Sequence, residues 1–165
     1  MFSHVGIIGL ELIGASVAGA VRKAWPDVRL TGVDTDGRTR EVALAKGLVD
    51  EALDASDPTF TKLLADGFDL VVIATPVDAD EPYLRAIAES GYAGIVTDTS
   101  STKGRITEMA AELLALPQNF VPGHPMAGSE VNGIDGARDD LFEGAYWILC
   151  PDEDTPPDQI GRAHV

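Results

Sequence analysis

The sequence predicts a doubly wound α/β fold, with a mainly parallel sheet and helices on both of its faces. Short apolar, β-rich runs alternate regularly with helix-compatible segments, which is typical of a sheet built from right-handed crossovers. The first apolar run also breaks at a glycine turn that opens a helix, as a βαβ unit does. With 165 residues, 45% of them apolar, the chain has the length of one typical domain and enough apolar side chains for a core.

The first three elements form a complete βαβ unit. Residues 5–9 are an apolar run that stops at glycine, and residues 12–24 follow in a helical pattern. Pro26 ends this helix, because proline has no amide hydrogen with which to continue it. Residues 28–33 give a second strand, which closes at Asp34.

The following elements continue the alternation. We expect helices at 38–46, 57–65, 81–90 and 102–116, and strands at 70–74, 94–97 and 119–121. The strand at 70–74 is apolar throughout, as expected where a sheet is covered on both faces. Beyond Pro122 several glycines loosen the pattern until a last strand at 146–149, and so long a loop at the end of a sheet is a place where binding and chemistry occur.

Charge and composition exclude several classes of protein. Asp and Glu number 27 against 12 Lys and Arg, and the net charge of −15 repels a phosphate backbone, so no nucleic-acid partner is expected. The start of the sequence lacks the basic region of a signal peptide, and no apolar run approaches the ~18 residues of a membrane span, so no membrane partner is expected either. Cys150 is the only cysteine, so no internal disulfide can form. These features predict a reduced, cytoplasmic location.

The turn between the first strand and the first helix has the placement of the dinucleotide fingerprint Gly-x-Gly-x-x-Gly. The first and third glycines of the fingerprint are present, and they allow a tight turn and close packing of the helix on the strand. Glu11 replaces the second glycine and puts a carboxylate where a pyrophosphate approaches the backbone. The alternative is a tight turn that binds no ligand. The candidate cofactor-binding residues of this turn are Gly9, Glu11, Leu12, Ile13 and Gly14.

Asp34 lies twenty residues beyond Gly14, at the end of the second strand. A carboxylate at this place accepts hydrogen bonds from both hydroxyls of an adenosine ribose and repels a 2′-phosphate, which favours NAD as the cofactor. Arg38 lies close by in the sequence and keeps NADP as an alternative. The other interpretation of Asp34 is an ordinary turn aspartate.

Two further segments carry side chains suited to chemistry. The hydroxyl-rich run from Thr97 to Lys103 lies between a strand and a helix, where it can bind a ligand or only cap backbone amides. His124 is the only histidine away from the chain ends, and it is either a general base or a structural histidine. No group of side chains has the spacing of metal ligands, so no metal is expected.

Taken together, these segments resemble the prephenate dehydrogenase family of tyrosine biosynthesis, and the resemblance covers about residues 4–151. Five motifs carry it: Gly-Leu-x-Leu-Ile-Gly-x-Ser at 9–16, Ala-Thr-Pro-Val at 74–77, Thr-Asp-x-x-Ser-x-Lys at 97–103, Gly-His-Pro-Met-Ala-Gly-Ser-Glu at 123–130 and Leu-Phe-Glu-Gly-Ala-x-Trp at 141–147. The fingerprint is common among dinucleotide-binding proteins, whereas the Gly-His-Pro-Met-Ala-Gly run is not.

The resemblance implies roles for residues in three of these motifs. Ser101 and His124 would face the reacting ring as the catalytic residues, and Ser129 and Glu130 fall at positions on the substrate side. The family also has a helical C-terminal domain that dimerises and supplies an arginine for the substrate carboxylate. That domain is absent from this sequence, so a homodimer is expected only in its presence. The residues that the resemblance places along the cofactor are Thr75, Pro76 and Val77.

We therefore expect residues 1–150 to form a dinucleotide-binding domain of the Rossmann type. Residues 151–159 have the prolines and carboxylates of a linker. Residues 160–165 look like the translation of a sequencing adapter, and we expect a non-native tail without function.

The expected activity is the oxidative decarboxylation of prephenate or arogenate with NAD. Hydride would leave the ring carbon that carries the hydroxyl, and His124 would accept a hydrogen bond and then the proton from that hydroxyl. The fragment alone is expected to be inactive. The alternatives are a non-catalytic dinucleotide-binding or scaffold module, in which Glu11 has ended tight cofactor binding, and another dehydrogenase of small hydroxy acids.

Overall fold

A computed structural model describes residues 2–116 and 119–151 of the chain. Its main sheet contains six parallel strands in the order β3-β2-β1-β4-β5-β6. These strands are β1 (His4–Ile8), β2 (Arg29–Val33), β3 (Glu51–Leu53), β4 (Leu70–Ile73), β5 (Ile95–Asp98) and β6 (Phe120–Val121). The predicted doubly wound fold is confirmed. The predicted tail, and the predicted linker beyond Pro151, lie outside the described residues.

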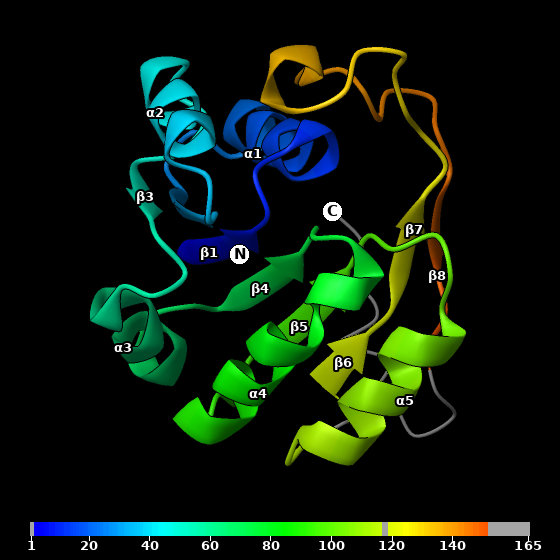
Figure 1. The fold of residues 1–165 in the computed structure, drawn as a ribbon. Coiled ribbons are helices and arrows are strands. Elements are labelled where there is room, and N and C mark those ends of the chain that lie inside the picture. Colours follow the sequence, from blue (N-terminus) through cyan, green and yellow to red (C-terminus); the bar gives the residue numbers. More distant parts are fainter. Residues whose placement is uncertain (1, 117–118, 152–165) are drawn as a thin grey trace.

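In the part of the chain that the structure describes, five α-helices cover the two faces of the sheet (Figure 1). They are α1 (Leu12–Ala24), α2 (Gly37–Ala45), α3 (Pro58–Asp66), α4 (Glu81–Ser90) and α5 (Gly104–Leu113). The strand order reverses between β1 and β4, so right-handed crossovers put α1 and α2 on one face and α3, α4 and α5 on the other. Ligands of such sheets bind at the carboxyl ends of the strands, beside this reversal.

Alternation along the strands supplies a core to each face. Successive strand residues point to opposite sides, so Ile7 packs in the cluster under α1 while Ile8 packs in the cluster under α3 and α4. Both side chains are almost fully buried. Local signals fix the helix ends: Asp36 accepts a hydrogen bond from the Thr39 amide at 3.0 Å, and Asp57 accepts one from the Thr59 amide at 2.8 Å.

Two short strands that follow β6 form a separate antiparallel ribbon. They are β7 (Gly123–Pro125) and β8 (Trp147–Leu149), and His124 lies opposite Ile148. A strand at the place of β8 was predicted from the sequence. The segment that contains His124 was predicted to be a loop, and that prediction is wrong, because the segment forms β7. Gly-His-Pro contains no β-branched residue, and β7 exists only because β8 supplies its hydrogen-bond partner from more than twenty residues away. β3 was missed for a similar reason, since three residues carry too little pattern.

The excursion, residues 126–146, connects β7 to β8 and folds back over α1 and α2 (Figure 1). It contains the single 3-10 turn η3 (Ile134–Gly136). The Arg138 amide donates to Ser16 Oγ at 3.1 Å, and Lys46 Nζ donates to the Ile134 carbonyl at 3.1 Å. The excursion is thus anchored to the first helices of the chain.

Candidate functional site

The turn between β1 and α1 requires two of its glycines. Gly9 has φ +88°, and a Cβ there would lie 2.9 Å from the Ala74 carbonyl carbon and oxygen. A Cβ on Gly14 would lie 1.9 Å from the Gly9 carbonyl oxygen, which no side chain can tolerate. These contacts bring the start of α1 directly against the ends of β1 and β4.

Glu11 precedes the first residue of α1 and is exposed. Its backbone is extended and its side chain makes no capping hydrogen bond. The carboxylate therefore stands at the positive end of the α1 dipole, where anions are stabilised. Glu11 also lines two neighbouring hollows, so it lies at the boundary between them.

The first hollow, about 510 Å³, lies between the β1–α1 turn, the end of β2 and α4. Asp34 is at its edge, and the carboxylate accepts hydrogen bonds from the Leu10 amide at 2.8 Å and the Asp36 amide at 2.9 Å. Both carboxylate oxygens are thus fixed by backbone while each retains a further acceptor position. Apolar side chains, among them Phe60 and Tyr83, line the opposite wall.

Arg38 points away from Asp34 and toward the excursion. Its guanidinium pairs with Asp135 at 2.8 Å, and both side chains are more than half exposed. Arg40 takes the place beside Asp34 instead, since it donates to the Asp34 carbonyl and pairs with Asp54 at 2.9 Å. Arg38, which was predicted as a cofactor-binding residue, therefore does not line the first hollow.

The second hollow, about 240 Å³, lies on the other side of Glu11. One wall is the segment 74–77 that follows β4, and the other is the segment 99–102 that follows β5. The two segments meet here because parallel strands end at the same edge of the sheet. Of the residues predicted to take part, the structure gathers Glu11, Leu12, Ile13, Thr75, Pro76, Val77 and Ser101 around this hollow.

His124 lies on β7, half-buried, and its Nδ1 atom is buried without a hydrogen-bond partner among the described residues. It does not line either hollow, and no hydrogen bond joins it to Ser101 within the described chain. Ser129 and Glu130 are exposed at the start of the excursion, where Ser129 Oγ accepts a hydrogen bond from the Val131 amide at 3.1 Å. The structure thus brings the predicted cofactor residues together but leaves the predicted substrate-side residues apart from them.

Comparison with known proteins decides the family. A family model described as the prephenate dehydrogenase nucleotide-binding domain matches residues 17–164. The chain belongs to this family. The predicted family is thereby confirmed.

Relatives of the family show how much of a longer protein the chain matches. Prephenate dehydrogenase of Bacillus subtilis is 36% identical over 151 residues, which are 90% of this chain and 39% of that protein. The structure of Synechocystis arogenate dehydrogenase is 36% identical with a TM-score of 0.82, over 97% of this chain and 54% of that one. The structure of Aquifex aeolicus prephenate dehydrogenase with hydroxyphenyl propionate and NAD+ is 25% identical with a TM-score of 0.86, over 99% and 55%. The chain spans about half the length of these relatives, or less.

Within this member of the family, a buried ion pair supports the strand that carries His124. Asp98, at the end of β5, has no exposed surface, and its carboxylate pairs with Lys103 Nζ at 2.5 Å. Lys103 Nζ also donates to the Gly123 carbonyl at 2.5 Å, and the Gly123 amide donates to Asp98 Oδ1 at 3.1 Å. The pair therefore holds both backbone groups of the residue before His124. Neither charged residue was named as a site residue, although the motif at 97–103 contains both.

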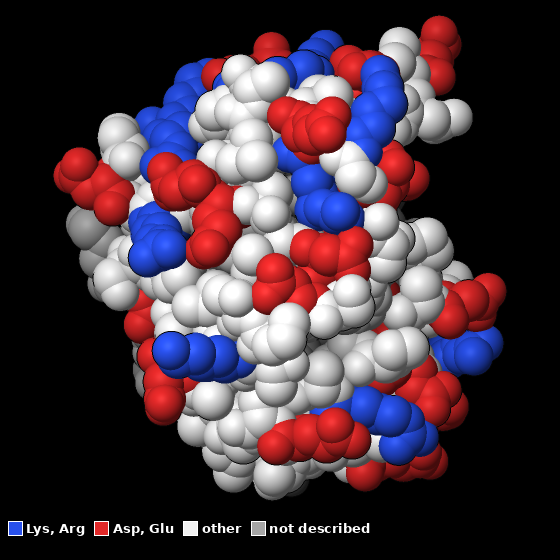
Figure 2. Space-filling model, turned by 60° about the vertical axis from the view of Figure 1, so that its left-hand side comes forward, with Lys and Arg blue, Asp and Glu red and all other residues white. Residues whose placement is uncertain are grey.

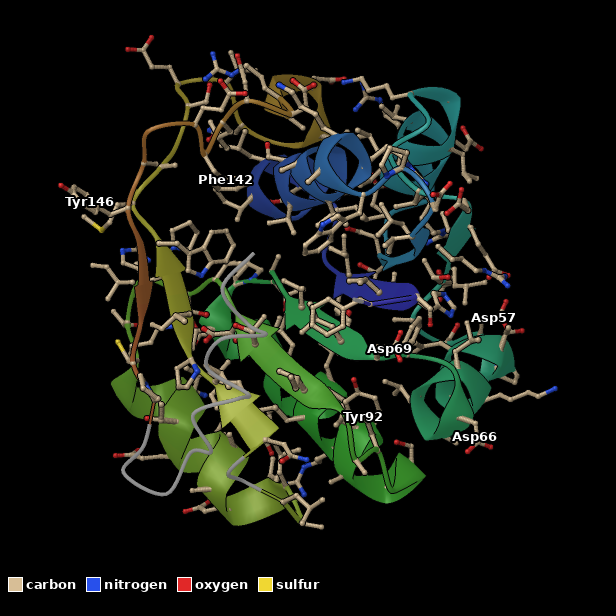
Figure 3. The ribbon with its side chains drawn as sticks, turned by 180° about the vertical axis from the view of Figure 1, so that it is seen from behind. Asp57, Asp66, Asp69, Tyr92, Phe142 and Tyr146 are labelled. Carbon is tan, nitrogen blue, oxygen red and sulfur yellow. The ribbon has the colours of Figure 1, made fainter. Side chains whose placement is uncertain are left out.

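A third hollow, about 410 Å³, contains none of the predicted site residues. It lies on the α1 face of β4 and β5, where α1 lines one side and Phe142 and Trp147 line the other. Phe142 points inward beside α1, whereas Tyr146 stands out from the edge of the molecule (Figure 3). Tyr146 is 81% exposed.

The charged side chains form no single-sign stripe on the face that Figure 2 shows, where acidic and basic residues are interspersed. Within residues 2–116 and 119–151, no cluster of His, Cys, Asp and Glu could hold a metal ion. No helix in the same residues is long and apolar enough to cross a membrane.

Proposed function

We propose that the chain is the NAD-binding part of a prephenate or arogenate dehydrogenase. The observation that carries this proposal is the pair of hollows on either side of Glu11, with Asp34 at the outer edge of the first one. In a doubly wound sheet the adenosine lies by the end of the second strand, the pyrophosphate at the first helix and the nicotinamide beyond it. The first hollow then takes the adenosine and the second takes the nicotinamide.

The residues fit this cofactor at three points. Gly9 and Gly14 allow α1 to approach the pyrophosphate, and the Asp34 carboxylate is held by two amides in a position to accept the ribose hydroxyls. The same charge opposes the 2′-phosphate of NADP, and Arg38, the alternative partner for that phosphate, is already paired with Asp135. Glu11 is the point that fits least well, because its carboxylate faces the pyrophosphate position.

The reaction that we propose is a hydride transfer followed by loss of CO2. NAD, when bound, accepts the hydride from the ring carbon that bears the hydroxyl. His124 accepts the hydroxyl proton as the C–O bond becomes a carbonyl. The resulting dienone carries its carboxylate in a position vinylogous to a β-keto acid, so the C–C bond to the carboxylate breaks and its electron pair makes the ring aromatic. Ser101 orients His124 or the nicotinamide carboxamide, and Ser129 and Glu130 contact the substrate.

The longer relatives suggest what the complete enzyme adds. We propose that a helical C-terminal domain supplies the arginine for the substrate carboxylate and the dimer interface, so that the present chain binds NAD but turns over little substrate. Lys103 and Asp98 support the position of His124 from within this chain. A cytoplasmic location remains a prediction.

Calorimetric titration of the purified chain with NAD and with NADP tests the cofactor assignment. We expect NAD to bind and NADP to bind more weakly. No binding of either would favour the non-catalytic module, for which Glu11 is the specific observation. Assays with prephenate, arogenate and small hydroxy acids, on a protein extended by a C-terminal domain, then test the substrate. Turnover of a hydroxy acid alone would overturn the proposed reaction.

A further inference from the structure

Asp80 is a buried carboxyl group that the proposed reaction does not use. It lies between the 3-10 turn η1 (Val77–Ala79) and α4, and its exposed fraction is 0%. Although it occupies the N-cap position of α4, its side chain does not cap the helix. Instead, Thr75 Oγ1 donates to Asp80 Oδ1 at 2.5 Å. The carboxyl group thereby holds the segment 74–77, which is one wall of the second hollow.

The second oxygen of Asp80 has a neighbour on the opposite wall, because the Ser100 hydroxyl acts on this carboxyl group. Asp80 Oδ2 is buried without a hydrogen-bond partner, and so is Ser100 Oγ. Burial raises the pKa of Asp80 to about 6, and the neighbouring hydroxyls of Thr75 and Ser100 act in the opposite direction. Buried polar atoms are normally paired, and each of these two atoms is the partner that the other lacks.

We propose that Asp80 is a positioning residue that ties together the two walls of the second hollow. One carboxyl oxygen holds Thr75 and the other binds the Ser100 hydroxyl, so the spacing between the segments 74–77 and 99–102 is fixed. An ionised carboxylate accepts from both hydroxyls, and a neutral carboxyl accepts from Thr75 and donates to Ser100, so the bridge exists in either state. The inference rests on the proposed function, because a bound nicotinamide is what makes the spacing matter.

The charged groups that act on Asp80 belong to one ion pair. Asp98 and Lys103 act on Asp80 in opposite directions and are paired with each other at 2.5 Å. On α4 itself, burial raises the pKa of Tyr83, which keeps that phenol neutral.

An exposed ion pair nearby provides a matched control. Asp78 Oδ1 accepts from Arg105 at 2.8 Å, which also joins η1 to α5, but both side chains are more than half exposed. Surface pairs of this kind contribute little. Asp78→Ala therefore removes a carboxylate two residues from Asp80 without touching the buried bridge.

Amide hydrogen exchange of the chain without cofactor tests the bridge itself. Asp80→Ala should speed exchange in both segments, 75–79 and 99–102, with little change in β1. Asp80→Asn should resemble the wild type, since its amide accepts from Thr75 and donates to Ser100. Ser100→Ala is a small change that should fold, and it should also loosen both segments, whereas Asp78→Ala should not. Acceleration of only one wall, or of neither, in Asp80→Ala and Ser100→Ala would overturn the proposal.

Calorimetric titration with NAD then separates a positioning role from a merely structural one. We expect Asp80→Ala to weaken NAD binding about two- to tenfold, the value of one lost hydrogen bond, and Asp80→Asn to bind almost as the wild type does. Unchanged affinity in an Asp80→Ala protein whose walls exchange faster would overturn the positioning role. If the wild type itself does not bind NAD, the proposed function fails, and the exchange experiment still decides whether the bridge exists.

Discussion

Glu11→Gly should tighten NAD binding, because it removes a carboxylate from the position that a pyrophosphate approaches. The structure gives Glu11 no hydrogen bond that would hold its side chain away, and it lies at the boundary of both hollows. Two unit charges about 4 Å apart repel by roughly 1 kcal/mol in water and about 4 kcal/mol in partly buried surroundings. Glu11 is exposed, so the lower part of this range applies, and we expect affinity to rise about five- to thirtyfold.

Calorimetric titration at low and high salt tests this expectation, with Glu11→Gln as the control that keeps the side chain but removes its charge. Raised salt should improve binding by the wild type more than by either variant, because it screens the repulsion. The same substitutions should lower thermal stability slightly, since an acidic residue favours the positive end of α1. Equal NAD affinities for all three proteins would refute the reasoning and mean that Glu11 turns away from the pyrophosphate.

Four further outcomes follow from the site. NAD should bind more tightly than NADP, because the Asp34 carboxylate repels a 2′-phosphate. Asp34→Ser should reduce the difference between the two affinities, as titration with each cofactor would show. In a protein extended by a C-terminal domain, His124→Asn should lower turnover by about two to four powers of ten with little change in NAD affinity; near-normal turnover would make the histidine structural. Lys103→Met should lower the free energy of unfolding by about 3–5 kcal/mol, because it leaves the buried Asp98 carboxylate without its ion-pair partner. Denaturant unfolding measures this loss, and a value below about 1 kcal/mol would contradict the prediction. The pKa of Asp80 is raised from 3.8 to about 6, so its contribution to folding stability is present at low pH and is lost as pH rises through about 6. Asp80→Asn should therefore be about 1–3 kcal/mol more stable than the wild type near pH 8 and equally stable below about pH 4. Unfolding curves at both pH values test this difference.

Local patterns predicted the fold and the cofactor side of the site because the relevant signals are local. Gly9 and Gly14 are required by contacts within one turn and with the adjacent strand, and Asp34 follows from the length of one βαβ unit. The parallel order of strands then places the segments after β4 and β5 beside that turn without further information. Seven predicted residues lie around one hollow: Glu11, Leu12 and Ile13 were predicted from the turn itself, whereas Thr75, Pro76, Val77 and Ser101 were implied by the resemblance to the family.

The remaining features depend on contacts that no local pattern records. Arg38 is paired with Asp135, which lies 97 residues further along the chain, so its sequence position beside Asp34 gave no sign of that partner. Asp80 follows an exposed turn, and nothing in the sequence around it indicates that its side chain is fully buried. β7 likewise exists through its pairing with β8.

The excursion makes the order in which the chain folds matter for the site. Its hydrogen bonds reach back 88 residues from Ile134 to Lys46, 120 from Glu143 to Lys23 and 122 from Arg138 to Ser16. Contacts so distant in sequence carry a large closure entropy and form only on a surface that is already in place. α1 and α2 are synthesised first, so we expect them to serve as the template on which the excursion docks, with β8 pairing with β7 once the excursion is in place. The strand that carries His124 then gains its partner β8 about sixty residues of synthesis after α4, whose residues complete the lining of the first hollow.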